Sequence, residues 1–318
     1  MSLHWLRRAF VLAACASSAL LAGCGGGGNV ESQFTPTRVI AFGDGFSDLG
    51  QRGPRYTVND GSVNVWSQQV AASYGRPLTA AASGGLSYAT GNARINSKPD
   101  AAGNSTSFTV KEQIDSFLAA QSIGSNDLVI VSGGIADIVA EVGRLNAGVQ
   151  TSAQMLANIG QAGRDLGAQV RRVVQAGGKY VLVAGSYNLG RSPWAQTTGQ
   201  ANLLTSASTR FNEEMLVSIV DLGANVLYVD AALHFNLVTG RPSSYNLSDA
   251  ASTACTSADP GPGIGTGNGQ VNSSLCTPAT LQPGIDPGRF LFADRIYPTP
   301  QGHRLFGDYA FARIRTRF

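Results

Sequence analysis

Short apolar runs alternate with longer amphipathic stretches through most of this 318-residue chain. The alternation is typical of α/β proteins with a mainly parallel sheet, because each helical stretch carries the chain back to the edge where the next strand begins. We therefore expect a three-layer α/β/α sandwich with a five-stranded sheet, whose site lies beyond the carboxyl ends of the strands. The expected strands are residues 38–42, 78–82, 127–132, 179–184 and 225–230.

Helical periodicity predicts the covering layers. The expected helices are residues 63–74, 109–121, 152–176 and 200–221, and a last helix that runs to about residue 315. Thr299-Pro300 predicts the start of that last helix, with Thr as N-cap and Pro in the first helical position. Residues 88–107 and 247–289 lack periodicity and are rich in Asn, Gly or Pro, so we expect them to form loops.

The first residues have the pattern of an export signal. Arg7 and Arg8 precede an apolar stretch, residues 9–22, that is too short to span a bilayer comfortably. The stretch ends in Leu21-Ala22-Gly23-Cys24, which resembles the bacterial lipobox, and this implies lipidation of Cys24 and anchoring at a membrane. The alternative is an ordinary secretory signal with an incidental Cys.

This N-terminal pattern sets the predicted domain organisation and location. We expect a signal peptide at 1–23, the lipidated Cys24 with a flexible tether at 24–36, and one domain at 37–318. Gly25 rather than Asp follows the Cys, which favours the outer membrane if the usual sorting pattern applies. The leaflet, the ligand and the oligomeric state are left open.

Charge and cysteine content exclude several kinds of partner. Removal of the signal would lower the formal net charge from +3 to +1, and no basic run would remain, so a nucleic-acid partner is not expected. No Cys/His cluster resembles a zinc site, and we expect neither metal nor cofactor. Cys255 and Cys276 would form a disulfide in an oxidising compartment; two free thiols are the alternative.

The first expected strand ends in Phe42-Gly43-Asp44-Gly45-Phe46-Ser47-Asp48-Leu49-Gly50. This segment closely resembles the signature of SGNH (GDSL-type) ester hydrolases, Phe-Gly-Asp-Ser-x-Ser-Asp-x-Gly. In that family the first Ser attacks the ester carbonyl. Here the position is Gly45, which has no side chain and therefore no nucleophile.

The remaining blocks of the family can be followed in order. Residues 80–85 resemble the second block, in which Gly84 matches the glycine whose N–H binds the oxyanion. Residues 131–137 resemble the third block, but Ala136 replaces its oxyanion Asn. In the last block, Asp294 remains while Tyr297 replaces the catalytic His. Further similarity to the secreted esterase and lipase branch lies at 65–66, 187–193, 211–212 and 291–294.

Three coordinated losses predict that the family mechanism has been abandoned. Loss of nucleophile and base together costs on the order of 10⁶-fold in a serine hydrolase. A neutral phenol at Tyr297 is a poor proton acceptor, and Ala136 removes a side-chain donor. Among fallback residues, Ser47 is the strongest candidate nucleophile and His303 its candidate base, although a structural hydroxyl and a helical core position are their simpler interpretations.

Three functions remain open. The first is a pseudoenzyme whose degenerate cleft binds a lipid, an acyl ester or a glycan of the cell envelope, with Tyr297 as an aromatic wall. The second is an ester hydrolase that uses a displaced pair such as Ser47 and His303. The third is a purely structural lipoprotein without a ligand.

Overall fold

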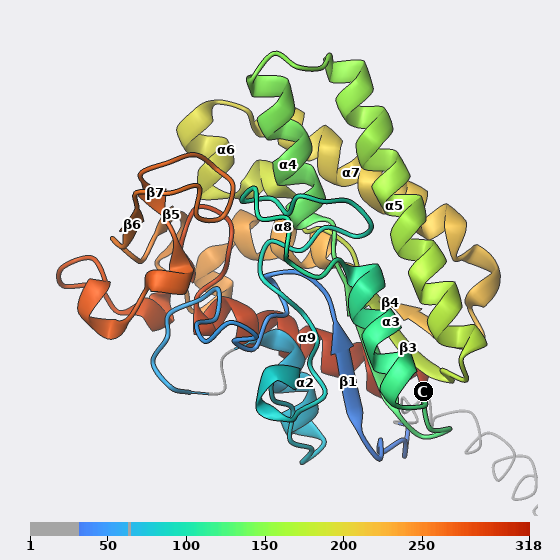
Figure 1. Ribbon diagram of the computed structural model, residues 1–318. Coiled ribbons are helices and arrows are strands. Elements are labelled where there is room, and N and C mark those ends of the chain that lie inside the picture. The colour runs from blue at the N-terminus through green and yellow to red at the C-terminus, as the bar shows by residue number, and fades with distance from the viewer. Residues whose placement is uncertain (1–31, 63–64) are drawn as a thin grey trace, which may run out of the picture.

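The computed structural model describes residues 32–62 and 65–318 (Figure 1). Its main sheet holds four parallel strands in the order β1 (Val39–Phe42), β2 (Leu128–Ser132), β3 (Tyr180–Ala184) and β4 (Val226–Tyr228). The strands are short and apolar and almost entirely buried, as expected for a parallel sheet with helices on both faces. The predicted three-layer α/β/α architecture is confirmed.

The predicted fifth strand at 78–82 is wrong. Ala80 and Ala41 each make only an isolated bridge to Ser87, beside the outer edge of β1. After Ala80 the chain forms a short 3-10 helix, η1 (Ala81–Ser83), which ends at Gly84 in the left-handed conformation. An apolar run of this length does not distinguish a strand from a tight turn that packs against the sheet edge.

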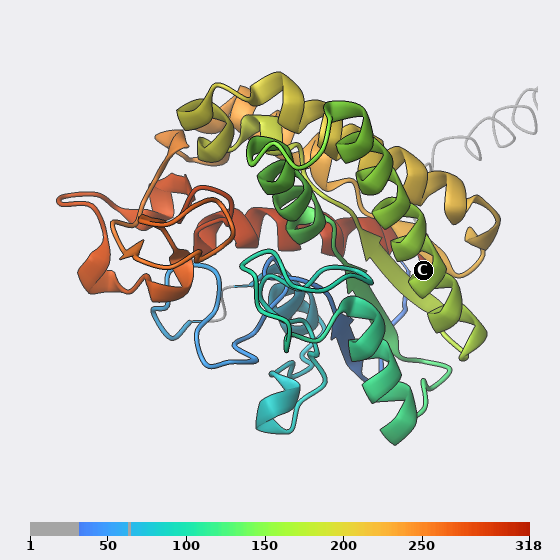
Figure 2. The same cartoon turned by 45° about the horizontal axis from the view of Figure 1, so that its top comes forward.

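The helices form two layers around the sheet. Helices α5 and α7 pack on each other with α3 and α4 on one side, and α2 packs on α9 on the other, as the views in Figures 1 and 2 show. Helix α4 follows β2 directly and was not predicted. The helices are α2 (Trp66–Ser73), α3 (Val110–Ala120), α4 (Ile135–Asn146), α5 (Ser152–Gln175), α6 (Pro193–Thr198), α7 (Ala201–Ser218), α8 (Ala231–Gly240) and α9 (Pro300–Arg317).

Local sequence explains where several helices begin. Thr109 and Thr151 each form a capping box with the residue three positions later, which starts α3 and α5. Thr299 accepts a hydrogen bond from the Gly302 N–H, and Pro300 occupies the first position of α9, as predicted.

Residues 88–107 are largely irregular, and the predicted excursion at 247–289 holds only short elements. Strand β5 (Asp249–Thr253) pairs with β8 (Phe290–Phe292), and β6 (Ala258–Asp259) pairs with β7 (Gln270–Val271). The short 3-10 helices after η1 are η2 (Leu189–Arg191), η3 (Val220–Leu222), η4 (Pro242–Tyr245), η5 (Ser273–Leu275), η6 (Pro278–Thr280) and η7 (Pro287–Arg289).

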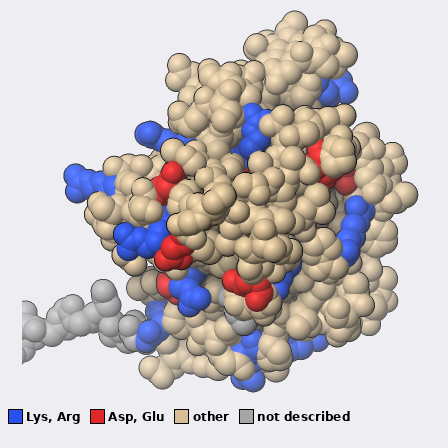
Figure 3. Space-filling model, turned by 90° about the vertical axis from the view of Figure 1, so that its left-hand side faces the viewer, with Lys and Arg blue, Asp and Glu red and all other residues tan. Residues whose placement is uncertain are grey.

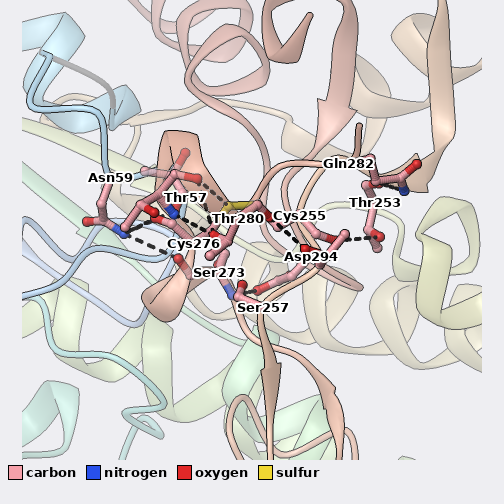
Figure 4. Close-up of a disulfide and its surroundings, with 12 residues drawn as sticks. Thr57, Asn59, Thr253, Cys255, Ser257, Ser273, Cys276, Thr280, Gln282 and Asp294 are labelled. Atoms are coloured by element: carbon pink, nitrogen blue, oxygen red, sulfur yellow. Dashed lines mark hydrogen bonds between the residues drawn. A yellow bond between two sulfur atoms is a disulfide. The ribbon is translucent and has the colours of Figure 1, made fainter. Parts of the chain in front are cut away.

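The predicted disulfide between Cys255 and Cys276 is present and closes this excursion (Figure 4). The Asn59 side-chain amide donates to the carbonyls of Ser273 and Cys276, and the Ser273 N–H donates to the Asp294 carboxylate. The disulfide closes the excursion on itself, and the hydrogen bond from Ser273 to Asp294 holds it against the segment that carries the last motif.

The predicted signal peptide at 1–23, Cys24 and most of the tether lie outside the described residues. Within the described part of the chain, no helix combines the length and apolar character needed to cross a bilayer.

Candidate functional site: a filled catalytic position

The first, third and last motif segments meet beyond the carboxyl end of β1. Gly45 lies three residues after β1, and Ala136 lies in the first turn of α4, where its N–H faces the Asp44 carboxylate at 3.5 Å. Asp294 and Tyr297 follow β8. The topology thus brings together the residues that sequence similarity assigned to the site, with the exception of Gly84.

Tyr297 fills the space that a side chain at position 45 would need. A Cβ atom built on Gly45 would lie 2.7 Å from the Tyr297 Oη and 2.8 Å from its Cζ. Non-bonded heavy atoms attract at about 3.5–4.0 Å and repel strongly at these shorter separations. The glycine and the tyrosine are therefore mutually dependent: the phenol fits because residue 45 has no side chain.

Tyr297 is only 1 % exposed, so the expectation of an accessible aromatic wall is wrong. Its ring packs at 5.1 Å from the ring of Tyr56. Burial, together with the nearby Asp44 carboxylate, raises the pKa of Tyr297 well above the ordinary value, and the phenol stays neutral. A neutral phenol sealed from solvent cannot replace an imidazole as a general base.

Tyr56 is a site residue that sequence reasoning missed. Its ring lies against Gly91, where a Cβ atom would collide with the phenol, and burial raises its pKa. Tyr56 sits in an irregular segment without periodicity, and only the glycine at 91 gave any signal of a close approach.

Asp294, the retained member of the last motif, supports the backbone. Its carboxylate accepts hydrogen bonds from the N–H groups of Ser273 at 2.9 Å, Ile296 at 2.8 Å and Tyr297 at 2.6 Å. It is fully buried, and burial raises its pKa. The carboxylate that would orient a histidine in the family thus shapes the turn that carries Tyr297.

The two carboxylates of the first motif have similar structural roles. Asp44 accepts from the Phe46 N–H, and Asp48 accepts from the N–H groups of Gly50, Gln51 and Gly91. Burial raises the pKa of each to about 6. These bonds hold the turn after β1 in place.

Asp137 likewise supports the backbone of the third motif segment. Its carboxylate accepts from the Ile95 N–H and forms an ion pair with Arg94 at 3.3 Å, and burial raises its pKa to about 6. Arg94 also pairs with Glu141 at 2.8 Å.

The structure places the fallback residues Ser47 and His303 in the core. The Ser47 hydroxyl is 2.7 Å from the Ser132 Oγ and accepts from the Trp66 indole N–H at 2.9 Å. The His303 Nδ1 accepts the backbone N–H of Trp66 at 3.3 Å, and burial lowers the pKa of His303 to about 3. Among the described residues, no hydrogen bond joins Ser47 to His303.

The role assigned to Gly84 is wrong. This residue is exposed, and its N–H donates to the Ala81 carbonyl at 2.9 Å within the turn that ends η1. The neighbouring Gly85 N–H likewise donates to the Ala80 carbonyl. Both donors are already used by the turn and are not directed at a substrate.

An open hollow lies next to the closed catalytic position, against α4 and α5. It has a volume of about 320 Å³ and is lined by charged and amide side chains: Arg94, Ser97, Lys98, Asp137, Glu141, Arg144, Asn158, Gln161, Ala162 and Asp165. A second hollow of about 300 Å³ shares Arg94 and Arg144 and has a more apolar lining that includes Pro99, Ala140 and Val149. We call the first of these the α4 hollow.

The described residues contain no cluster of three or more His, Cys, Asp or Glu side chains suited to hold a metal ion.

Two sequence comparisons show what this chain is similar to. A sequence model described as GDSL-like lipase/acylhydrolase matches residues 39–310. An uncharacterized protein in the trpE-trpG intergenic region of Pseudomonas putida is 26% identical over 156 residues, which is 49% of this chain and 25% of that protein. This chain therefore covers only a quarter of that relative.

A similar solved structure is a member of the lipolytic protein G-D-S-L family from Veillonella parvula. It has 11% sequence identity and a TM-score of 0.44, and the match covers 86% of this chain and 96% of that one.

Proposed function

The chain belongs to the GDSL-like lipase/acylhydrolase family, and from this premise we propose that it is a catalytically inactive member that binds a ligand in the cell envelope. The observation that carries the proposal is the contact between Gly45 and Tyr297. A phenol fills the place of the nucleophile, and the positions of the nucleophile, the base and the oxyanion donor are all buried.

Closure of the site affects binding as well as chemistry. An ester carbonyl has to reach the turn after β1 before any group there can act on it, and Tyr297 and Tyr56 occupy that space. Even a surviving backbone donor would have no access to substrate. The geometry therefore supports the proposed inactivity, in addition to the missing functional groups.

The α4 hollow is the proposed ligand site. Its lining offers guanidinium, ammonium, carboxylate and amide groups, and the charges of both signs are balanced. Such a surface suits a neutral or zwitterionic ligand with many hydroxyl and amide groups, and a cell-wall glycan fits this description better than an acyl chain does. Asp137 and Arg94 join the hollow to the motif segments.

Export as a lipid-anchored protein is part of the proposal. It is supported by the lipobox-like sequence at 21–24 and by the disulfide Cys255–Cys276, since disulfides persist in oxidising compartments. We place the protein at the outer membrane, held by lipid on Cys24.

Inactivity can be tested with p-nitrophenyl butyrate and a fluorophosphonate probe. We expect neither turnover nor labelling of the parent protein. The informative comparison is the triple variant Gly45→Ser, Ala136→Asn and Tyr297→His, which restores all three groups and also removes the phenol that blocks residue 45. Esterase activity in the triple variant alone would support the proposal.

The competing function, ester hydrolysis through Ser47, predicts a different result. The parent would then be labelled, and the label would disappear in Ser47→Ala. That outcome would overturn the proposal.

Ligand binding is tested by calorimetry with soluble peptidoglycan fragments and, separately, with a short-chain fatty acid. We expect binding of the glycan and its loss in Arg144→Ala. The matched control is Arg171→Ala, on α5 outside the α4 hollow, where the guanidinium pairs with Asp221. Equal affinities in the two variants would exclude the hollow as the site.

A further inference from the structure

One end of the molecule lies opposite the motif segments. The strands are parallel, so the residues that precede them gather at the amino edge of the sheet. The Ser32 N–H donates to the Arg315 carbonyl at 2.8 Å, and the Arg317 side chain donates to the carbonyl of Gly223. The start of the described chain, the C-terminus and the end of α7 therefore share this end, as Figures 1 and 2 show.

Three apolar side chains at this end are exposed to solvent. Leu216 and Val217 lie in the last turn of α7, and Val220 begins η3. Their exposed fractions are 37%, 72% and 80%. Branched aliphatic side chains within one turn make a small patch of the kind that marks a contact with another apolar phase.

Basic side chains accompany these residues. Lys179 immediately precedes β3, and Arg313 and Arg317 lie near the end of α9; all three are exposed. Two carboxylates at this edge, Asp127 and Asp221, are each paired with an arginine, and a third, that of the exposed Glu213, lies one turn before Val217. We call Leu216, Val217, Val220, Lys179, Arg313 and Arg317 the amino-end patch.

A different face of the molecule provides a contrast. Figure 3 shows Lys, Arg, Asp and Glu side chains interspersed over a mostly uncharged surface. The amino-end patch combines apolar and basic side chains, which is the composition of a surface that contacts anionic lipid, although the carboxylates of Asp221 and Glu213 lie beside it.

We propose that the amino-end patch rests on an anionic lipid bilayer and that the α4 hollow faces away from it. The inference rests on the proposed lipidation of Cys24. Seven residues lie between Cys24 and Ser32, a span of at most about 30 Å, so a lipid on Cys24 would hold this end of the domain near the bilayer. Leu216, Val217 and Val220 would then enter the interface, and the basic residues would contact lipid phosphates.

This orientation narrows the class of ligand. Helix α5 has 24 residues, about 36 Å, and it separates the loop after α4 from the amino edge of the sheet. A ligand of the α4 hollow would therefore come from the compartment that the domain faces. Cell-wall glycan meets this condition, and lipid of the anchoring membrane does not.

Tryptophan fluorescence can report the orientation. The native Trp66 and Trp194 are buried, so an added surface Trp dominates quenching by lipid. Val220→Trp places the reporter in the amino-end patch. Val149→Trp places it in the loop after α4, at a position that is 63% exposed. Both full-length, lipidated variants are reconstituted into phosphatidylglycerol vesicles whose acyl chains carry bromine.

We expect bromine to quench the added Trp at position 220 and to leave the one at position 149 unaffected. Equal quenching of the two, or quenching at 149 alone, would overturn the proposal. Absence of quenching at both positions would also overturn it, because the tethered domain would then stand clear of the bilayer.

A second arm separates this inference from the lipid anchor. Mass spectrometry of the N-terminal peptide tests acylation of Cys24. Cys24→Ala protein that lacks residues 1–23, and with them Trp5, which the mature lipidated protein also lacks, is mixed with the same vesicles. Binding through the patch alone should again quench only the Trp at position 220. If Cys24 carries no lipid but this pattern appears, the anchor is wrong and the surface assignment stands.

Charge substitutions give the matching control. In the Cys24→Ala background, Lys179→Gln with Arg313→Gln should weaken vesicle binding by on the order of fivefold for each charge removed. Arg144→Gln, which removes a charge beside the α4 hollow, should leave binding unchanged. Equal losses per charge removed in the two variants would show that net charge, rather than the patch, governs binding.

Discussion

The motif segments contain two groups of positions, one that differs from the family signature and one that matches it. Gly45, Ala136 and Tyr297 stand where the family has its reacting groups, and none of them keeps the required chemistry. Asp44, Asp48, Asp137 and Asp294 are all retained as carboxylates, and each accepts at least one hydrogen bond from a backbone N–H. Within a few residues, one group changed and the other did not.

An active enzyme needs these segments both to form the turns of the fold and to present the reacting groups, and the two groups of positions distinguish these needs. The carboxylates satisfy buried N–H groups, and their loss would leave those donors without partners. The replaced positions are those to which similarity assigns the reacting groups, and Tyr297 refills the space beside Gly45. What remains is the part of the motif that the fold itself requires.

The largest effect should come from breaking the retained group. Asp294→Ala would leave three buried N–H groups unpaired, and we expect a loss of about 3–5 kcal/mol in the free energy of unfolding. Urea denaturation measures it. Asp286→Ala is the control, because Asp286 also accepts a backbone N–H but lies at the surface. Losses of similar size in both would show that burial does not distinguish Asp294.

The second-largest effect is expected in the pH dependence of the free energy of unfolding, through the retained carboxylate of Asp44. The Asp44 pKa is raised to about 6 in the folded state, so its contribution is fully present below the unfolded pKa and is lost as pH rises through 6. Asp44→Asn does not titrate. Relative to the parent, it should therefore gain about 2–3 kcal/mol between pH 4 and pH 7.

Unfolding curves at several pH values compare the two proteins directly, and the shared histidine contributions cancel in the difference. A constant difference from pH 4 to pH 7 would contradict the prediction.

Restoring one member of the replaced group should be harmful by itself. Gly45→Ser forces a side chain against the Tyr297 phenol, and we expect a loss of about 1–3 kcal/mol. Adding Tyr297→His should recover most of it, because the smaller ring leaves room. Thermal unfolding of the two single variants and the double variant gives the coupling energy. Additive effects would show that the two residues do not compete for space.

The smallest effect is expected from the phenol hydroxyl. No hydrogen bond joins the Tyr297 Oη to another described residue, so Tyr297→Phe should change stability by less than about 1 kcal/mol. It should also leave the protein inactive toward p-nitrophenyl butyrate. A loss of more than about 2 kcal/mol would assign the hydroxyl a structural partner.

Periodicity predicted much of the fold because the strands and long helices bury continuous apolar faces. Thr299-Pro300 gave the start of α9, since capping depends on neighbouring residues alone. The apolar run at 78–82 misled because its pairing partner, Ser87, adds only isolated bridges. Helix α4 was missed although its face is buried, because it begins at a glycine within a motif.

Similarity assigned Gly45 and Asp294 to the candidate site, and the structure brings both of them against Tyr297. The site was not predictable where a role depends on what packs against the residue. Gly84 lies in a glycine-rich segment that resembles the family block, yet its N–H is used by its own turn. The approach of Tyr56 to Tyr297 joins segments that are distant in sequence and carries no local signal.

The contact between Gly45 and Tyr297 also limits the evolutionary routes open to this chain. With the phenol in place, a mutation that returns serine to position 45 meets a steric barrier before it can offer any catalytic benefit. A histidine at position 297 would gain nothing while residue 45 lacks a nucleophile. Each reversion is therefore unfavourable or neutral until the other has occurred. This epistasis makes recovery of the family chemistry harder than the gain of a new role by the same fold.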